Sequence, residues 1–206
     1  MGHHDDAADH AHEHSHDHDH HDNDFTDRID RLNDPIQFRY LSAEELRELL
    51  DPAPDWTVAD LGSGTGLFTD ELAPVVDTLY ALDTNDGMHE AYRERGVPEN
   101  VDLVTADVAA TPFADGELDG AISLRTFHHG VAEALPELAR VLRPGGRLVV
   151  FDWSATRAGE TERGPPADMC FDLATAQSLL LDHGFRIQRA QERRETFVVV
   201  ATRRGD

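Results

Sequence analysis

The feature that most constrains this chain is a glycine-rich turn, VADLGSGTGLF (58–68), which directly follows a short apolar run. The run TVADL (57–61) is typical of a buried strand, and the residues after the turn are typical of a helix. Glycine adopts positive φ and lets a ligand approach the main chain, while a helix N-terminus presents free N–H groups. The turn therefore favours a bound ligand, and a tight strand-to-helix connection is the alternative explanation.

Apolar runs alternate with helical patterns along most of the chain. After 57–61 we expect strands over 78–83, 101–107, 118–124 and 147–153, and then two terminal strands joined by a charged hairpin. We expect helices over 42–50, 66–75, 86–95, 131–142 and 172–184, with capping residues Ser42 and Asp172. This alternation predicts an α/β fold with a mostly parallel sheet covered by helices on both faces. Ligands of such sheets lie beyond the carboxyl ends of the strands.

The composition divides the chain into two unequal regions. Residues 1–24 hold nine of the thirteen His and eight of the acidic residues, without any Arg. Such a segment cannot bury enough apolar surface to fold alone, so we expect a disordered tail followed by one domain over 25–206. Imidazoles on a flexible tail suit Zn, Ni or Cu, with a solvated acidic tail or a cloning remnant as alternatives. The candidate metal ligands are His10, His12, His14, His16, His18 and His20.

The charge of the chain excludes several classes of function. Asp and Glu number 41 against 18 Arg and no Lys, which gives a formal charge of −23. This charge opposes non-specific binding to nucleic acids or anionic membranes. No stretch is apolar enough to span a bilayer, no signal peptide is visible, and the lone Cys170 rules out an internal disulfide, so we expect a cytoplasmic protein. The absence of Lys beside many acids resembles proteins of halophiles that accumulate salt.

Two acidic residues stand where later strands are expected to end. Asp83 follows Gly62 by 21 residues, and Asp107 ends the run VDLVTAD (101–107). A carboxylate at the first position can accept from both hydroxyls of a ribose, and one at the second from an adenine amino group. The alternatives are a turn Asp and a surface Asp. The glycine spacing is G-x-G-x-G, whereas the dinucleotide fingerprint is G-x-G-x-x-G and would need a third glycine where Leu67 stands.

Five segments in order resemble the motifs of class I S-adenosylmethionine-dependent methyltransferases: VADLGSGTG, ALDTND, TADVAATPF, LDGAISLRTFHH and ELARVLRPGGRLVVFDW. The group related to the C-methyltransferases of ubiquinone and menaquinone biosynthesis looks closest, because GPP (164–166) and GF (184–185) recur there as well. The resemblance covers about 25–202. It implies a Rossmann-like sheet of seven strands with the last strand antiparallel, and S-adenosyl-L-methionine as the cofactor.

The resemblance also implies roles for individual residues. Asp60 and the loop Gly62–Gly66, which includes Ser63 and Gly64, would hold the methionine part of the cofactor. Asp83 would take the ribose, and Thr84 and Met88 would lie near the adenine. Asp107 and the Val108 N–H would read the adenine edge, and Leu124 would lie near the sulfonium. The segment 25–40 would fold over the cofactor as a lid.

Methyl transfer from a sulfonium depends mainly on alignment, and a general base is needed only when the acceptor must lose a proton. The candidate bases are His128, His129 and Asp152, which follow the fourth and fifth strands. Capping or packing roles are the alternatives for all three. We expect Arg125 to pair with a neighbouring acid, or else with a substrate carboxylate.

The sequence thus predicts a small-molecule methyltransferase. The sequence is also compatible with two other functions. One is a nicotinamide-dependent oxidoreductase, and the other is a metal-associating or regulatory protein that uses the same fold.

Overall fold

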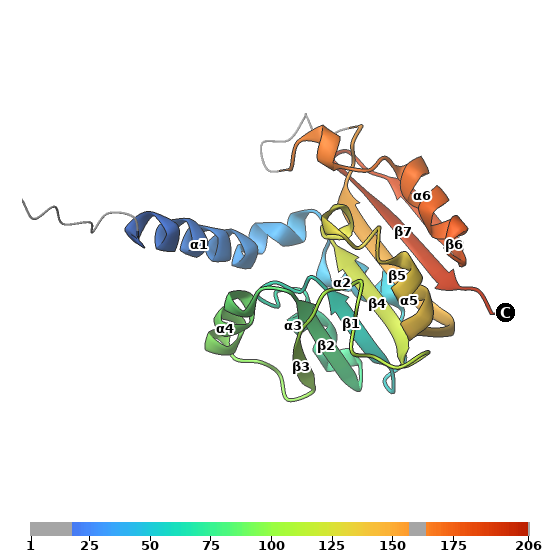
Figure 1. The fold of residues 1–206 in the computed structure, drawn as a ribbon, viewed down its shortest axis with the longest axis horizontal. Coiled ribbons are helices and arrows are strands. Elements are labelled where there is room, and N and C mark those ends of the chain that lie inside the picture. The colour runs from blue at the N-terminus through green and yellow to red at the C-terminus, as the bar shows by residue number, and fades with distance from the viewer. Residues whose placement is uncertain (1–17, 157–163, 206) are drawn as a thin grey trace, which may run out of the picture.

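The computed structural model describes residues 18–156 and 164–205, with side chains from Phe25 onward. Within these ranges seven strands form one sheet in the order β3-β2-β1-β4-β5-β7-β6 (Figure 1). The strands are β1 (Thr57–Leu61), β2 (Thr78–Asp83), β3 (Val101–Thr105), β4 (Leu118–Leu124), β5 (Leu142–Trp153), β6 (Phe185–Glu192) and β7 (Thr196–Arg203). Strands β1 to β5 pair in parallel, while β7 runs antiparallel to both β5 and β6. The predicted fold class, with its antiparallel last strand, is confirmed.

The helices begin where the sequence supplies capping groups. They are α1 (His18–Asn33), α2 (Ala43–Leu50), α3 (Thr69–Leu72), α4 (Asp86–Arg95), α5 (Leu135–Val141) and α6 (Leu173–Asp182), with 3-10 turns η1 (Pro35–Arg39), η2 (Ala73–Val75), η3 (Phe127–His129) and η5 (Ala167–Met169). The Ser42 hydroxyl accepts from the Glu45 N–H at 3.1 Å, and the Asp172 carboxylate accepts from the Thr175 N–H at 2.7 Å. Both predicted caps are therefore confirmed.

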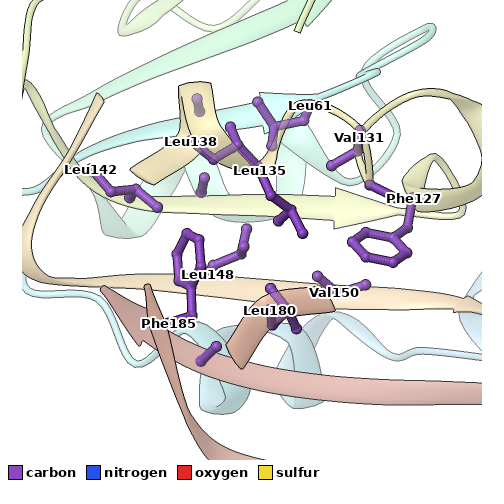
Figure 2. Close-up of a cluster of buried hydrophobic side chains, with 14 of the residues drawn as sticks. Leu61, Phe127, Val131, Leu135, Leu138, Leu142, Leu148, Val150, Leu180 and Phe185 are labelled. Atoms are coloured by element: carbon purple, nitrogen blue, oxygen red, sulfur yellow. The ribbon is translucent and has the colours of Figure 1, made fainter. Parts of the chain in front are cut away.

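The sheet is buried on both faces because its central strands carry apolar side chains on both of their faces. Successive residues of β5 alternate between two hydrophobic clusters: Leu148 and Val150 face one, and Val149 and Phe151 face the other. Helices α5 and α6 cover the first cluster (Figure 2), and α2 and α3 cover the second. This two-sided burial requires near-continuous apolar strands, and such apolar runs are easy to recognise in the sequence.

Two predicted helices are shorter in the structure than in the sequence pattern. The helix expected over 66–75 is limited to α3 and η2, because Gly66 has a φ of 83° and Pro74 cannot donate to a helical turn. The helix expected over 131–142 begins only at Leu135, where a proline occupies its first turn. Strand β5 then begins at Leu142, which pairs with Leu118, so it takes in the RPGG segment (143–146) between the expected helix and the expected strand.

Helix α1 changes the predicted boundary of the tail. It begins at His18, inside the segment 1–24 that the composition predicted to be disordered, and extends away from the sheet (Figure 1). Helical hydrogen bonding propagates cheaply once started, and acidic residues suit a helix N-terminus. Of the candidate metal ligands, His10 to His16 lie outside the described residues, and the side chains of His18 and His20 are not among those described. In the described part of the chain, no helix has the length and apolarity that crossing a bilayer requires.

Candidate cofactor pocket

A pocket of about 430 Å³ opens at the carboxyl ends of β1 to β4. Strand order reverses here, because β1 pairs with β2 on one side and with β4 on the other. This is where open parallel sheets bind their ligands. Its walls include ten of the eleven residues predicted to bind the cofactor: Asp60, Gly62, Ser63, Gly64, Asp83, Thr84, Met88, Asp107, Val108 and Leu124. The eleventh, Gly66, does not line the pocket and packs against the Tyr92 ring.

The glycine-rich loop is held in a form that needs glycine. Gly62 and Gly66 have φ values of 77° and 83°, which L side chains rarely adopt. A Cβ on Gly62 would lie 2.5 Å from the Thr126 methyl group, and one on Gly66 would lie 2.1 Å from the Tyr92 ring. The Ser63 hydroxyl is buried in this loop and has no hydrogen-bond partner among the described residues. A polar atom left in this state fits a loop built to receive a polar ligand.

Two carboxylates join the loop to the neighbouring strands. Asp83, at the end of β2, accepts from the Gly64 N–H and from the Asn85 N–H, each at 2.9 Å. These bonds hold the carboxylate at the pocket wall, and each of its oxygens keeps acceptor capacity for a further donor. Asp60 is 3% exposed and accepts from the Thr69 hydroxyl at 2.7 Å. Burial raises the pKa of Asp60 to about 7, and the charge of Asp83 adds to the shift.

The far side of the pocket combines an apolar floor with an acidic edge. Met88 and Leu124 are buried, and Val108 is half-buried beside them. Asp107 is exposed, and one of its oxygens accepts from the Ala109 N–H at 2.8 Å. An apolar slot with a carboxylate at its rim suits a flat heteroaromatic ring that carries an amino group.

The three candidate bases occupy different places. His129 lines the pocket, whereas His128 and Asp152 are not among its lining residues. The His128 ring nitrogen Nδ1 lies 2.8 Å from Asp152, and this pair is 3% and 2% exposed at its side chains. The His129 ring lies 3.9 Å from the His128 ring, centroid to centroid. Partial burial, together with nearby His128 and Arg28, lowers the pKa of His129, so its ring is neutral at pH 7 and can accept a proton.

Of the three candidate bases, Asp152 has the most contacts inside the protein. Asp152 accepts from the backbone N–H groups of His128 and Trp153, at 3.0 Å and 2.7 Å, besides contacting the His128 ring. These contacts consume its acceptor capacity inside the protein. The carboxylate thus contacts both the ring and the backbone of His128, and it is not among the residues that line the pocket.

The pocket also contains residues that the sequence did not single out. Arg28 and Leu32 reach it from α1, Phe68 lines it from the start of α3, and Thr126 lines it from the end of β4, next to Arg125. Arg28 and Leu32 are four residues apart, so they lie on one face of the helix. That spacing, within the segment predicted to be a lid, is the signal that could have found them.

The fold and this pocket define a Rossmann-like methyltransferase domain. A family model described as "Methyltransferase domain" matches residues 59–150. The structure of an S-adenosylmethionine-dependent methyltransferase from Aquifex aeolicus is similar, with a TM-score of 0.76 and 26% identity, covering 85% of this chain and 97% of that one. The resemblance drawn from the motifs is confirmed: residues 59–150 match a methyltransferase domain, and the fold is similar to that of an S-adenosylmethionine-dependent methyltransferase.

Curated relatives are quinone-pathway enzymes by name. A demethylmenaquinone methyltransferase from Corynebacterium kroppenstedtii is 42% identical over 111 residues, which is 52% of this chain and 46% of the relative. A ubiquinone/menaquinone biosynthesis C-methyltransferase from Ectopseudomonas mendocina is 38% identical over 117 residues, which is 52% of this chain and 45% of the relative. The matches thus span about half the length of these relatives.

Proposed function

We propose that this chain transfers a methyl group from S-adenosylmethionine to a small-molecule acceptor. The observation that carries the proposal is the pocket at the switch point, where the glycine loop, Asp83 and Asp107 follow three successive strands. The unpartnered Ser63 hydroxyl and the acidic Asp60 suit the amino-acid part of this cofactor. The names of the curated relatives support a quinone-like acceptor as the first class to screen.

Each part of the cofactor is bound by the residues that the resemblance implies. The glycine loop and Asp60 hold the methionine part, Asp83 the ribose, Asp107 and Val108 the adenine edge, with Thr84 and Met88 beside the adenine and Leu124 beside the sulfonium. When bound, the cofactor supplies an activated methyl group. Arg28 lies on the same face of α1 as Leu32, whose Cδ1 is 3.6 Å from a Cβ built on Gly64. It is therefore placed to meet the carboxylate of the methionine part.

A calorimetric titration with S-adenosylmethionine, S-adenosylhomocysteine and NAD tests this function. We expect both adenosyl compounds to bind one per chain, and NAD to give no saturable heat. NAD binding would instead support an oxidoreductase. If none of the three bound while metal ions did, the chain would be a metal-associating protein built on this fold.

We further propose that His129 accepts a proton from the acceptor, while His128 and Asp152 position its ring. His129→Asn should lower the rate constant for methyl transfer by about 10²-fold, the usual loss when a general base is removed. The acceptor would come from a screen with methyl-labelled donor. The dissociation constant for S-adenosylhomocysteine should stay the same, as should all parameters of the control His183→Asn, which lies at the end of α6. Unchanged turnover in His129→Asn would exclude this role.

Three broader proposals concern the setting of the enzyme. The acidic, lysine-free composition supports a halophilic protein of the cytoplasm. The histidine-rich residues 1–24 support loose association of the tail with Zn, Ni or Cu, and no cluster of metal-ligating side chains occurs among the described residues. A zinc titration of chains with and without residues 1–24 tests the tail, because equal stoichiometry would show that it binds no metal.

A further inference from the structure

Arg125 has an unusual backbone conformation at the edge of the pocket. It follows the last residue of β4 and has a φ of 62°, one of two positive values among non-glycine residues in the described ranges. Its N–H donates to the Phe151 carbonyl of β5 at 2.6 Å, which fixes this conformation. Strain of this kind persists where the surroundings impose it, and it concentrates at functional sites. Here it places a guanidinium in the pocket wall.

The guanidinium has few partners within the protein. It donates to the Gln37 side-chain carbonyl and lies 5.8 Å from the centre of the Phe68 ring. Among the described side chains, those of 25–156 and 164–205, no carboxylate lies within ion-pair distance of it. Arg95 and Arg140, by contrast, pair with Asp70 and Glu137 at 2.6 Å. The expectation that Arg125 pairs with a neighbouring acid is therefore wrong.

Asp152 is the acid whose charge acts on Arg125, but it is already engaged. The His128 ring, the His128 N–H and the Trp153 N–H all contact its two oxygens, at 2.8 to 3.0 Å for His128 and 2.7 Å for Trp153. Burial lowers the pKa of Arg125, which reflects the cost of holding this charge away from water. An arginine left in this state is poised for an anion from outside the protein, since its planar fork suits a carboxylate or phenolate oxygen.

We propose that Arg125 binds an anionic oxygen of the methyl acceptor, so that the acceptor is a carboxylic acid or an ionised phenol. This inference rests on the proposed function and names its substrate class. The cofactor also carries a carboxylate, but Arg28 is the cation that shares a helix face with the side chain packed over the glycine loop. Arg125 contacts Gln37 and the Phe68 ring instead, and the charge of Asp152 acts on it.

The negative net charge of the chain makes anion binding a strict test of the proposal. A protein with a formal charge of −23 repels small anions in general, so preference for an anion over its neutral analogue requires a local cation. The probes are therefore 4-fluorobenzoate and 4-fluorobenzamide, which differ in charge while keeping the same ring. Fluorine NMR of each, with the full chain saturated by S-adenosylhomocysteine, measures their binding.

We expect 4-fluorobenzoate to bind at least tenfold more tightly than 4-fluorobenzamide. Arg125→Gln should remove that preference without changing the affinity for S-adenosylhomocysteine, and Arg125→Lys should keep part of it because the charge remains. Arg186→Gln, on the exposed face of β6, is the matched control and should behave as the unmodified chain does.

Each other outcome overturns the inference in a distinct way. Equal binding of the two probes to the unmodified chain contradicts it without any variant, so it can fail even if Arg125→Gln does not fold. Retained preference in Arg125→Gln places the anion elsewhere. A tenfold loss of S-adenosylhomocysteine affinity in Arg125→Gln assigns this arginine to the cofactor carboxylate. Failure of S-adenosylhomocysteine to bind the unmodified chain defeats the proposed function itself.

Discussion

The protonation state of the Asp60 carboxyl group should change when the cofactor binds. Burial raises its pKa to about 7, so near neutral pH the empty pocket holds a mixture of acid and carboxylate. An ammonium group beside it favours the carboxylate and lowers the pKa again. The same raised pKa affects folding: this residue contributes most stability below its unfolded pKa, and the contribution is lost as pH rises through about 7.

Cofactor binding should therefore release a proton below neutral pH. At pH 6.5, a carboxyl group with a pKa of about 7 is mostly protonated, so S-adenosylhomocysteine should displace roughly half a proton or more per chain. Calorimetry in two buffers of different ionisation enthalpy measures this release, which should vanish at pH 8.5. Asp60→Asn keeps the side-chain shape and should release none. The same release from Asp60→Asn would assign the proton to another group.

At the scale of elements, the loop between β1 and α3 depends on what packs behind it. Gly66 faces the Tyr92 ring of α4, and the Tyr92 hydroxyl donates to Asp70 of α3 at 2.5 Å. Arg95 of α4 also contacts Asp70 and the Thr65 carbonyl of the loop. The loop is thus supported by α4, so a defect at Gly66 should disturb the whole connection.

Two alanine substitutions separate backbone strain from steric conflict. Gly64→Ala should cost about 1–2 kcal/mol of unfolding free energy, since its φ is 55° while its Cβ would find space. Gly66→Ala should cost about 3 kcal/mol or more, because the same strain is joined by overlap with Tyr92. Guanidinium unfolding compares the two variants. Equal losses would mean that Tyr92 moves aside freely.

The strands and the ends of the strands could be predicted from the sequence, because apolar runs and glycine turns are local signals. Which charged side chains pair with one another could not be predicted from the sequence. Nothing local shows that Asp152 is engaged by His128 while Arg125, one residue beyond β4, lacks a carboxylate partner in the described chain; that depends on where β5 places its end. The length of α3 was also missed, since Gly66 has a positive φ and packs against Tyr92, which comes 26 residues later.

At the scale of the whole molecule, the excess of acids sets the response to salt. Residues 25–206 carry 33 acids against 18 Arg, a formal charge of −15 without the tail. Repulsion among these charges is screened over about 10 Å at 0.1 M salt and about 3 Å at 1 M.

The folded chain should therefore gain stability with KCl. The thermal midpoint should rise by several degrees between 0.1 M and 2 M, and the chain lacking residues 1–24 should rise less, because it carries a smaller net charge. Thermal unfolding followed by circular dichroism measures both. Full stability at low salt would contradict a halophilic design.

The central claim is that an adenosyl cofactor binds across the strand ends with its ribose at Asp83. Titration of S-adenosylhomocysteine into the unmodified chain and into Asp83→Ala measures this most directly, with exposed Asp102→Ala of β3 as the control. We expect one S-adenosylhomocysteine to bind per chain, with a loss of affinity of tenfold or more in Asp83→Ala and no loss in Asp102→Ala. Equal affinity in all three chains would contradict it.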